Sequence, residues 1–102
     1  MKKFEIGETY FQLGYYDLEG KLPSIKTLVF IGMDVFNEEA VETWCFQWAS
    51  SVAEFGLYPE VEKGSNVAVE LVTEETIHAV FTKDELIYRL EQGLEAWASE
   101  GP

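Results

Sequence analysis

The chain has 102 residues, enough for one domain with one core, and its apolar fraction of 47% with 15% aromatic residues excludes a disordered chain. Nineteen acidic against seven basic residues give a formal net charge of −12 at pH 7, which disfavours nucleic acid and anionic membranes as partners. No linker or internal repeat divides the sequence, so we predict a single domain over residues 1–102.

The acidic residues are unevenly distributed along the chain. Residues 1–26 hold four acidic and four basic residues, so the other fifteen acidic residues share 27–102 with only Lys63, Lys83 and Arg89. The negative electrostatic field of these residues attracts cationic protein surfaces, although acidic residues also keep small domains soluble without any partner. The single cysteine, Cys45, the lack of an apolar signal-peptide segment and the lack of an apolar run of about 20 residues predict a cytoplasmic protein outside the membrane.

Three segments in the first half of the chain have strand patterns. Thr9–Tyr16 alternates and is rich in aromatic residues, and Asp17–Gly20 is a turn signal. Ile25–Met33 is apolar on both faces at its centre, which is typical of a central strand covered on both sides. Val41–Ala49 is the third predicted strand, and three aromatic residues at a spacing of two should largely face a core: Trp44, Phe46 and Trp48.

The middle of the chain is less regular. Ser50-Ser51 followed by Val52–Gly56 predicts one or two helical turns with a serine cap and a terminal glycine, and a loop follows to Asn66. Val67–Val72 and Ile77–Phe81 are strand-like runs around Thr73-Glu74-Glu75-Thr76, which predicts a hairpin. A helix over Glu74–Phe81 is the alternative, and the β-branched residues favour the strand.

A C-terminal helix is the clearest element. Thr82 and Glu85 have the spacing of a capping box, in which each side chain bonds the backbone N–H of the other residue. An apolar stripe with helical spacing follows: Leu86, Ile87, Leu90, Leu94 and Trp97. Short connections between the strands favour antiparallel pairing. We therefore predict an α+β fold, an antiparallel sheet of about five strands with the C-terminal helix packed on it.

The sequence offers little for catalysis. Cys45 and His78 are the only cysteine and the only histidine, so a metal site with clustered ligands is not expected, and no cofactor is predicted. The two residues are the one candidate nucleophile–base pair, if the third and fifth strands bring them together. Cysteine in the middle of an apolar strand is more often a small core residue. We therefore expect a binding protein and not an enzyme.

Clusters of acidic residues provide the candidate binding surface. One surrounds the connection between the second and third strands, a second surrounds the turn before Thr76, and a third shares one face of the C-terminal helix with a tyrosine. A docking surface for a basic protein has this composition, because opposed fields raise the association rate. The candidate partner-binding residues are Asp34, Glu38, Glu39, Glu42, Glu74, Glu75, Asp84, Tyr88, Glu91 and Glu95.

A resemblance to a known protein family rests on two segments and on the acidic remainder of the chain. The segments are Gly7-Glu8-Thr9-Tyr10-Phe11 and Trp44-Cys45-Phe46-Gln47. In size and charge the chain resembles the small acidic immunity proteins with which bacteria neutralise basic toxin domains, including those of contact-dependent inhibition systems. The resemblance implies an inhibitor that covers the active site of a basic, nuclease-type toxin, and it assigns no residue. The alternative is a small-ligand or regulatory domain with an aromatic-lined pocket, built from Trp44, Trp48 and tyrosines.

Overall fold

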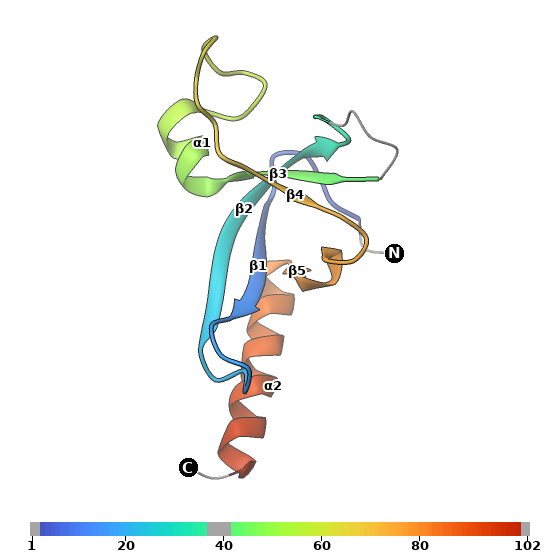
Figure 1. Cartoon of the computed structure of the whole chain (residues 1–102), viewed down its shortest axis with the longest axis vertical. Helices are drawn as coiled ribbons and strands as arrows, with labels where there is room; N and C mark the ends of the chain where they lie inside the picture. Colours follow the sequence, from blue (N-terminus) through green and yellow to red (C-terminus); the bar gives the residue numbers. More distant parts are fainter. Residues whose placement is uncertain (1–2, 37–41, 101–102) are drawn as a thin grey trace.

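The computed structural model describes residues 3–36 and 42–100, and for residues 93–100 it describes the backbone only. Five strands form one antiparallel sheet in the order β4-β3-β2-β1-β5 (Figure 1). In chain order the elements are β1 (Thr9–Tyr15), β2 (Pro23–Met33), β3 (Trp44–Trp48), α1 (Ala49–Phe55), β4 (Val69–Val72), the 3-10 turn η1 (Ile77–Ala79), β5 (Val80–Phe81) and α2 (Lys83–Glu100). The α+β class and the antiparallel sheet with a C-terminal helix are confirmed.

The hairpin of β1 and β2 is closed by an aspartate. The Asp17 carboxylate accepts hydrogen bonds from the backbone N–H of Leu22 at 2.9 Å and of Lys21 at 3.0 Å. Tyr16 donates its N–H to the Leu22 carbonyl at 2.9 Å. These bonds lower the pKa of Asp17, because the N–H groups of Leu22 and Lys21 stabilise the ionised carboxylate. The hairpin register runs from Thr9 opposite Val29 to Tyr15 opposite Pro23.

The prediction of a central second strand is confirmed, because β2 is buried on both faces from Leu28 to Ile31. The ladder between β2 and β3 is interrupted by a bulge between Phe30 and Gly32. Gly32 has a φ of 132°, where other residues are strained, and a Cβ there would lie 3.0 Å from a methyl carbon of Val35. The glycine therefore allows β2 to bend at the position where β3 joins it.

The core lies on one face of the sheet. Its buried cluster is Tyr10, Leu28, Phe30, Trp44, Phe46, Val72 and Val80. The ring of Phe4 packs across it, with ring centroids 4.8 Å from Tyr10 and 5.7 Å from Phe46. The Tyr10 hydroxyl accepts a hydrogen bond from the Glu5 N–H at 2.9 Å, which fixes the segment before β1 over the core. Two of the three predicted core aromatics are buried, whereas Trp48 is 36% exposed and lies under the ammonium of Lys26.

Helix α1 is attached to the sheet by a buried glutamine. The Gln47 amide nitrogen donates to the Ser51 hydroxyl at 3.1 Å and to the Gly56 carbonyl at 3.0 Å, and its oxygen accepts from the Tyr58 N–H at 2.8 Å. The predicted serine cap is wrong. The residue before α1 is Trp48, without a side-chain cap, and the Ser51 hydroxyl accepts instead from the Ala68 N–H at 3.0 Å. The glycine at the end of the helix, Gly56, is confirmed.

The predicted hairpin around residues 73–76 is wrong. Strand β4 pairs with β3 at one edge of the sheet, and β5 pairs with β1 at the other edge. Of the predicted strand Ile77–Phe81, only Val80 and Phe81 join the sheet, and the helix proposed as the alternative is reduced to η1. The cause is local: the Thr73 carbonyl accepts hydrogen bonds from the N–H groups of Thr76 and Ile77, and the Ile77 side chain packs on the core.

The capping box of α2 is confirmed. The Thr82 N–H donates to the Glu85 carboxylate at 2.8 Å, and the Glu85 N–H donates to the Thr82 hydroxyl at 3.3 Å. Leu86 is buried and Leu90 is half-buried, whereas Ile87 is 44% exposed. The helix contacts β1 and β5. The side chains of Leu94 and Trp97, the rest of the predicted stripe, lie outside the described part of the chain.

The molecule is elongated, and α2 and the hairpin of β1 and β2 extend away from the body that holds α1 (Figure 1). Its radius of gyration is 15.6 Å, whereas a compact domain of 100 residues has about 13 Å. No helix in the described ranges combines the length and the apolar character that crossing a bilayer requires. The elongated shape leaves the distal part of the hairpin accessible on its outer edge.

Candidate functional site

Two of the three predicted acidic clusters meet at one end of the sheet. Trp44 is paired with Val72 at the end of the ladder, so the segment before β3, with Glu42, and the segment after β4, with Glu74, lie at the same end of the sheet. Asp34 joins them because its carboxylate accepts a hydrogen bond from the Thr43 N–H at 2.8 Å. Glu75 follows Glu74 in the turn before η1. We call Asp34, Glu42, Glu74 and Glu75 the acidic edge, and all four are exposed.

The other predicted binding residues are not gathered there. Asp84, Tyr88 and Glu91 are exposed on α2, which leads away from the acidic edge (Figure 1). Glu38 and Glu39 lie outside the described residues, and so does the side chain of Glu95. Asp34 also has a structural role, because it adopts a φ of 52° and exchanges two hydrogen bonds with the backbone of Thr43.

The structure separates the candidate nucleophile from its candidate base. Cys45 is 1% exposed in β3, and His78 is exposed in η1, next to β5. Two strands, β2 and β1, lie between β3 and β5 in the sheet. Within residues 3–36 and 42–92, no three His, Cys, Asp or Glu side chains gather as metal ligation requires.

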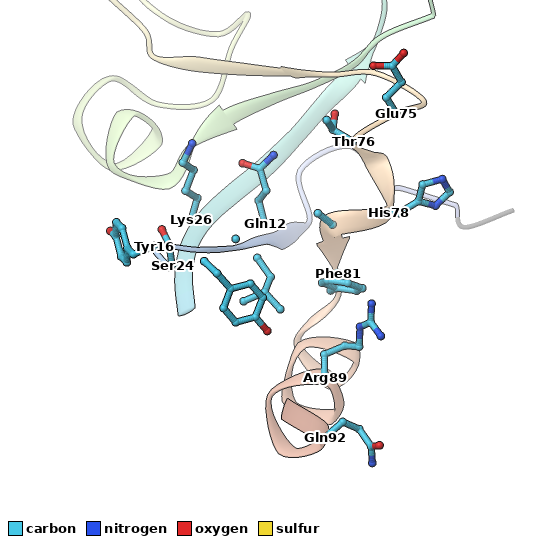
Figure 2. Close-up of a pocket in the computed structure, with 14 residues that line it drawn as sticks. Gln12, Tyr16, Ser24, Lys26, Glu75, Thr76, His78, Phe81, Arg89 and Gln92 are labelled. Carbon is cyan, nitrogen blue, oxygen red and sulfur yellow. The ribbon is translucent and has the colours of Figure 1, made fainter. Parts of the chain in front are cut away.

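An open groove of about 920 Å³ lies beside the outer edge of β1. One side is formed by the hairpin, with Gln12, Gly14 and Tyr15 among its residues, and the other by η1, β5 and the first turns of α2. Figure 2 shows Arg89 of α2 near the ring of Phe81, and Glu75 and His78 on the segment that leads into β5. The groove aromatics are Tyr15, Tyr16 and Phe81, so the pocket expected around Trp44 and Trp48 lies elsewhere and has other residues.

Two basic side chains of this acidic chain line the groove. They are Lys26 and Arg89, and the one carboxylate among the lining residues is that of Glu75. The Lys26 ammonium is 3.3 Å from a Glu70 carboxylate oxygen, so this charge is partly compensated. The Arg89 guanidinium lies 5.4 Å from the centroid of the Phe81 ring, and among the described residues no carboxylate forms an ion pair with it.

The groove also borders backbone that β5 leaves uncovered. β5 pairs only with Phe11 and Gln12 of β1. Backbone groups point alternately to the two sides of an antiparallel strand, and the Tyr16 N–H points to β2. The N–H and C=O groups of Tyr15 therefore point toward the groove, where no strand of the described chain pairs with them, whereas the Leu13 N–H faces Ala79 within the ladder that pairs Gln12 with Val80.

Sequence reasoning missed this groove. It depends on the length of β5, and the alternation of Ile77–Phe81 predicts a longer strand than the one that forms. Arg89 carried a signal, because it is one of only three basic residues after residue 26. Comparisons with models of known protein families, with curated proteins and with solved structures returned no match.

Proposed function

We propose that this chain is a cytoplasmic protein-binding module whose acidic edge docks on a cationic surface of a partner protein. In the proposed role it acts as an immunity-type inhibitor and covers the anion-binding active site of a basic, nuclease-type toxin domain. The observation that carries the proposal is the convergence of Glu42 and Glu74, from connections that are far apart in the sequence, at one end of the sheet.

Physical chemistry supports this choice of partner. Carboxylates that share a small exposed area repel one another, and a cationic surface relieves that repulsion on binding. The backbone around the acidic edge is held by hydrogen bonds, since Asp34 binds Thr43 and the Thr73 carbonyl closes the turn before η1. The charges are therefore presented on a fixed frame, which lowers the entropic cost of binding. Charge-complementary pairs associate at up to about 10⁸–10⁹ M⁻¹s⁻¹ at low salt.

The proposal predicts that the gene beside that of this chain encodes a basic toxin domain, and the test measures the association rate of that domain with this chain by stopped flow at low and high salt. We expect the rate to fall steeply between about 50 and 300 mM NaCl, because the Debye length shortens over this range. A rate that is the same at both salt concentrations would contradict electrostatic docking.

A matched pair of variants shows which carboxylates accelerate association with the partner. The double variant Glu42→Gln/Glu74→Gln removes two charges from the acidic edge, and Glu54→Gln/Glu62→Gln removes two exposed charges from α1 and the loop after it. Both variants change the net charge equally. We expect the first to slow association at low salt severalfold more than the second. Equal slowing would show that net charge alone, and not the acidic edge, attracts the partner.

A further inference from the structure

We propose that the outer edge of β4 binds an extended cationic segment of the partner protein by strand addition. This inference deepens the proposed function, because it rests on the acidic edge as the surface that attracts the partner and adds how the partner is held. It combines two observations, the outward backbone groups of Val69 and Leu71 and the carboxylates that lie next to them.

The backbone of β4 is paired on one side only. β4 leads from the loop after α1 to the turn before η1 and forms one edge of the sheet, with β3 as its neighbour (Figure 1). The Ala68 carbonyl points to β3, where it accepts a hydrogen bond from the Trp48 N–H at 2.9 Å. Because backbone directions alternate along an antiparallel strand, Glu70 also bonds β3, whereas Val69 and Leu71 direct their N–H and C=O groups outward.

These outward groups are available to another chain. In the described ranges, no backbone or side-chain group forms a hydrogen bond with the outward N–H and C=O groups of Val69 and Leu71. The Leu71 side chain is 52% exposed. An added strand lies about 4.8 Å from its neighbour and pairs with such groups, so each of the two residues offers it one donor and one acceptor.

The side chains of β4 specify which segment fits. Val69 and Leu71 lie on one face of the sheet, and Glu70 between them lies on the opposite face. An added strand alternates in the same way, so the residues opposite Val69 and Leu71 meet apolar side chains, and the residue between them lies beside a carboxylate. Cross-strand pairs of opposite charge and of apolar side chains stabilise a sheet. A segment that alternates apolar and cationic residues therefore suits both faces.

The charge around β4 also selects a cationic segment. Residues 64–82 contain no lysine or arginine, and their acidic residues are Glu70, Glu74 and Glu75. Lys26 lies 3.3 Å from a carboxylate oxygen of Glu70 and compensates part of its charge. Glu74 and Glu75 belong to the acidic edge, directly beyond the end of β4, and both are exposed. Cationic side chains of a segment that runs along β4 therefore lie in a negative field.

A second copy of this chain is the competing occupant of the edge. Pairing of β4 with β4 would bring together the acidic edges of two chains that each have a net charge of −12, and their repulsion opposes this pairing. A cationic segment gains attraction from the same field.

The test titrates the full chain with dye-labelled synthetic octapeptides and measures binding by fluorescence anisotropy. One peptide alternates Lys and Val, a second alternates Glu and Val, and a third alternates Lys and Pro. The third keeps the positive charge but lacks the N–H groups that would bond β4. We expect the Lys–Val peptide to bind about tenfold more tightly than either of the others, because it alone has both the charge and the donors.

Variants of the chain separate the backbone from the charge. Leu71→Pro removes one outward N–H and no hydrogen bond to β3, whereas Leu71→Thr keeps the N–H. We expect the Lys–Val peptide to bind Leu71→Pro about tenfold more weakly than Leu71→Thr. Glu74→Gln/Glu75→Gln should weaken binding more than the control Glu54→Gln/Glu62→Gln, which removes equal charge elsewhere. Equal affinity within either pair of variants would overturn the proposal.

Hydrogen exchange on the wild-type chain makes the test independent of variant folding. The amides of Val69 and Leu71 should exchange fast in the free chain and slowly with the Lys–Val peptide, whereas those of Glu70 and Val72, which face β3, should change little. Unchanged exchange would overturn the proposal. Slow exchange in the free chain that becomes fast on dilution would identify a second copy as the occupant instead. Salt-dependent association of the basic domain without any peptide binding would refute strand addition and leave the docking of the acidic edge standing.

Discussion

The side-chain amide of Gln47 donates a hydrogen bond of 3.1 Å to the hydroxyl of Ser51, one turn into the helix that follows its strand. Both side chains are buried, and both also bind backbone groups of the segment that returns from α1 to β4. A polar pair with all its partners satisfied fixes one arrangement of its surroundings. This pair therefore joins β3, α1 and the loop after α1 into one unit.

Replacing Gln47 by leucine should destabilise the protein by about 2–4 kcal/mol. Leucine is similar in volume but leaves the Tyr58 N–H and the Gly56 carbonyl without their partner, and unsatisfied buried polar groups cost free energy. The measurement is the free energy of unfolding from urea titration. Gln92→Leu, at an exposed position of α2, is the control and should stay within about 0.5 kcal/mol of wild type. A similar loss in both variants would show that the Gln47 bonds contribute nothing particular.

The capping box predicts a coupled pair at the start of α2. Thr82→Ala and Glu85→Ala should each lower the free energy of unfolding by about 1 kcal/mol, because each removes a partner of a helix-terminal N–H group. The double variant should lose less than the two single losses together. A double-mutant cycle measures this coupling, and Lys83→Ala, which has no part in the box, is the control. Strict additivity would count against the reciprocal arrangement.

Gly32 should tolerate no other residue without loss of stability. Gly32→Ala places a side chain at a φ of 132° and brings its Cβ to 3.0 Å from Val35, so we expect a loss of about 1–3 kcal/mol. Adding Val35→Ala removes the close contact but not the backbone strain. The double variant should therefore recover part of the stability that Gly32→Ala loses, relative to Val35→Ala alone. Full recovery would mean that the backbone angle is not strained.

The turn of the first hairpin should depend on pH through Asp17. Hydrogen bonds from Leu22 and Lys21 lower the pKa of Asp17 in the folded state. The ionised carboxylate therefore stabilises the folded state fully above the pKa of an unfolded aspartate, about 3.9. The contribution disappears as the pH falls through the lowered pKa of the folded state. Asp17→Asn imitates the protonated form. Thermal unfolding at pH 7 should show the variant less stable than wild type, and the difference should shrink as the pH falls below the pKa of an unfolded aspartate, about 3.9. A gap independent of pH would assign the effect to something other than ionisation.

Local patterns predicted the elements that local interactions determine. The capping residues Thr82 and Glu85 indicated the start of α2, and the apolar centre of Leu28–Ile31 indicated a strand buried on both faces. The edge partners of the sheet depend on interactions between distant segments. Val69–Val72 and Val80–Phe81 join opposite edges, and their spacing in the sequence alone suggests a hairpin.

The sequence also predicted only part of the candidate site. The acidic residues near Asp34 and Glu74 were identified from the sequence, but their position at the same end of the sheet follows from the pairing of Trp44 with Val72. The groove could not be predicted, because it exists only where η1 replaces a strand beside Tyr15. Conversely, Cys45 and His78 share no site because two strands separate them.

Hydrogen–deuterium exchange of the chain bound to its basic partner domain tests the proposed docking surface most directly. If the acidic edge is the interface, binding should slow exchange in the segments around Glu42 and around Thr73 to Thr76, which lie at one end of the sheet. Exchange in the loop after α1, around Glu60 and Glu62, should not change. Slowing confined to that loop or to α2, with Glu42 and Glu74 unaffected, would contradict the account.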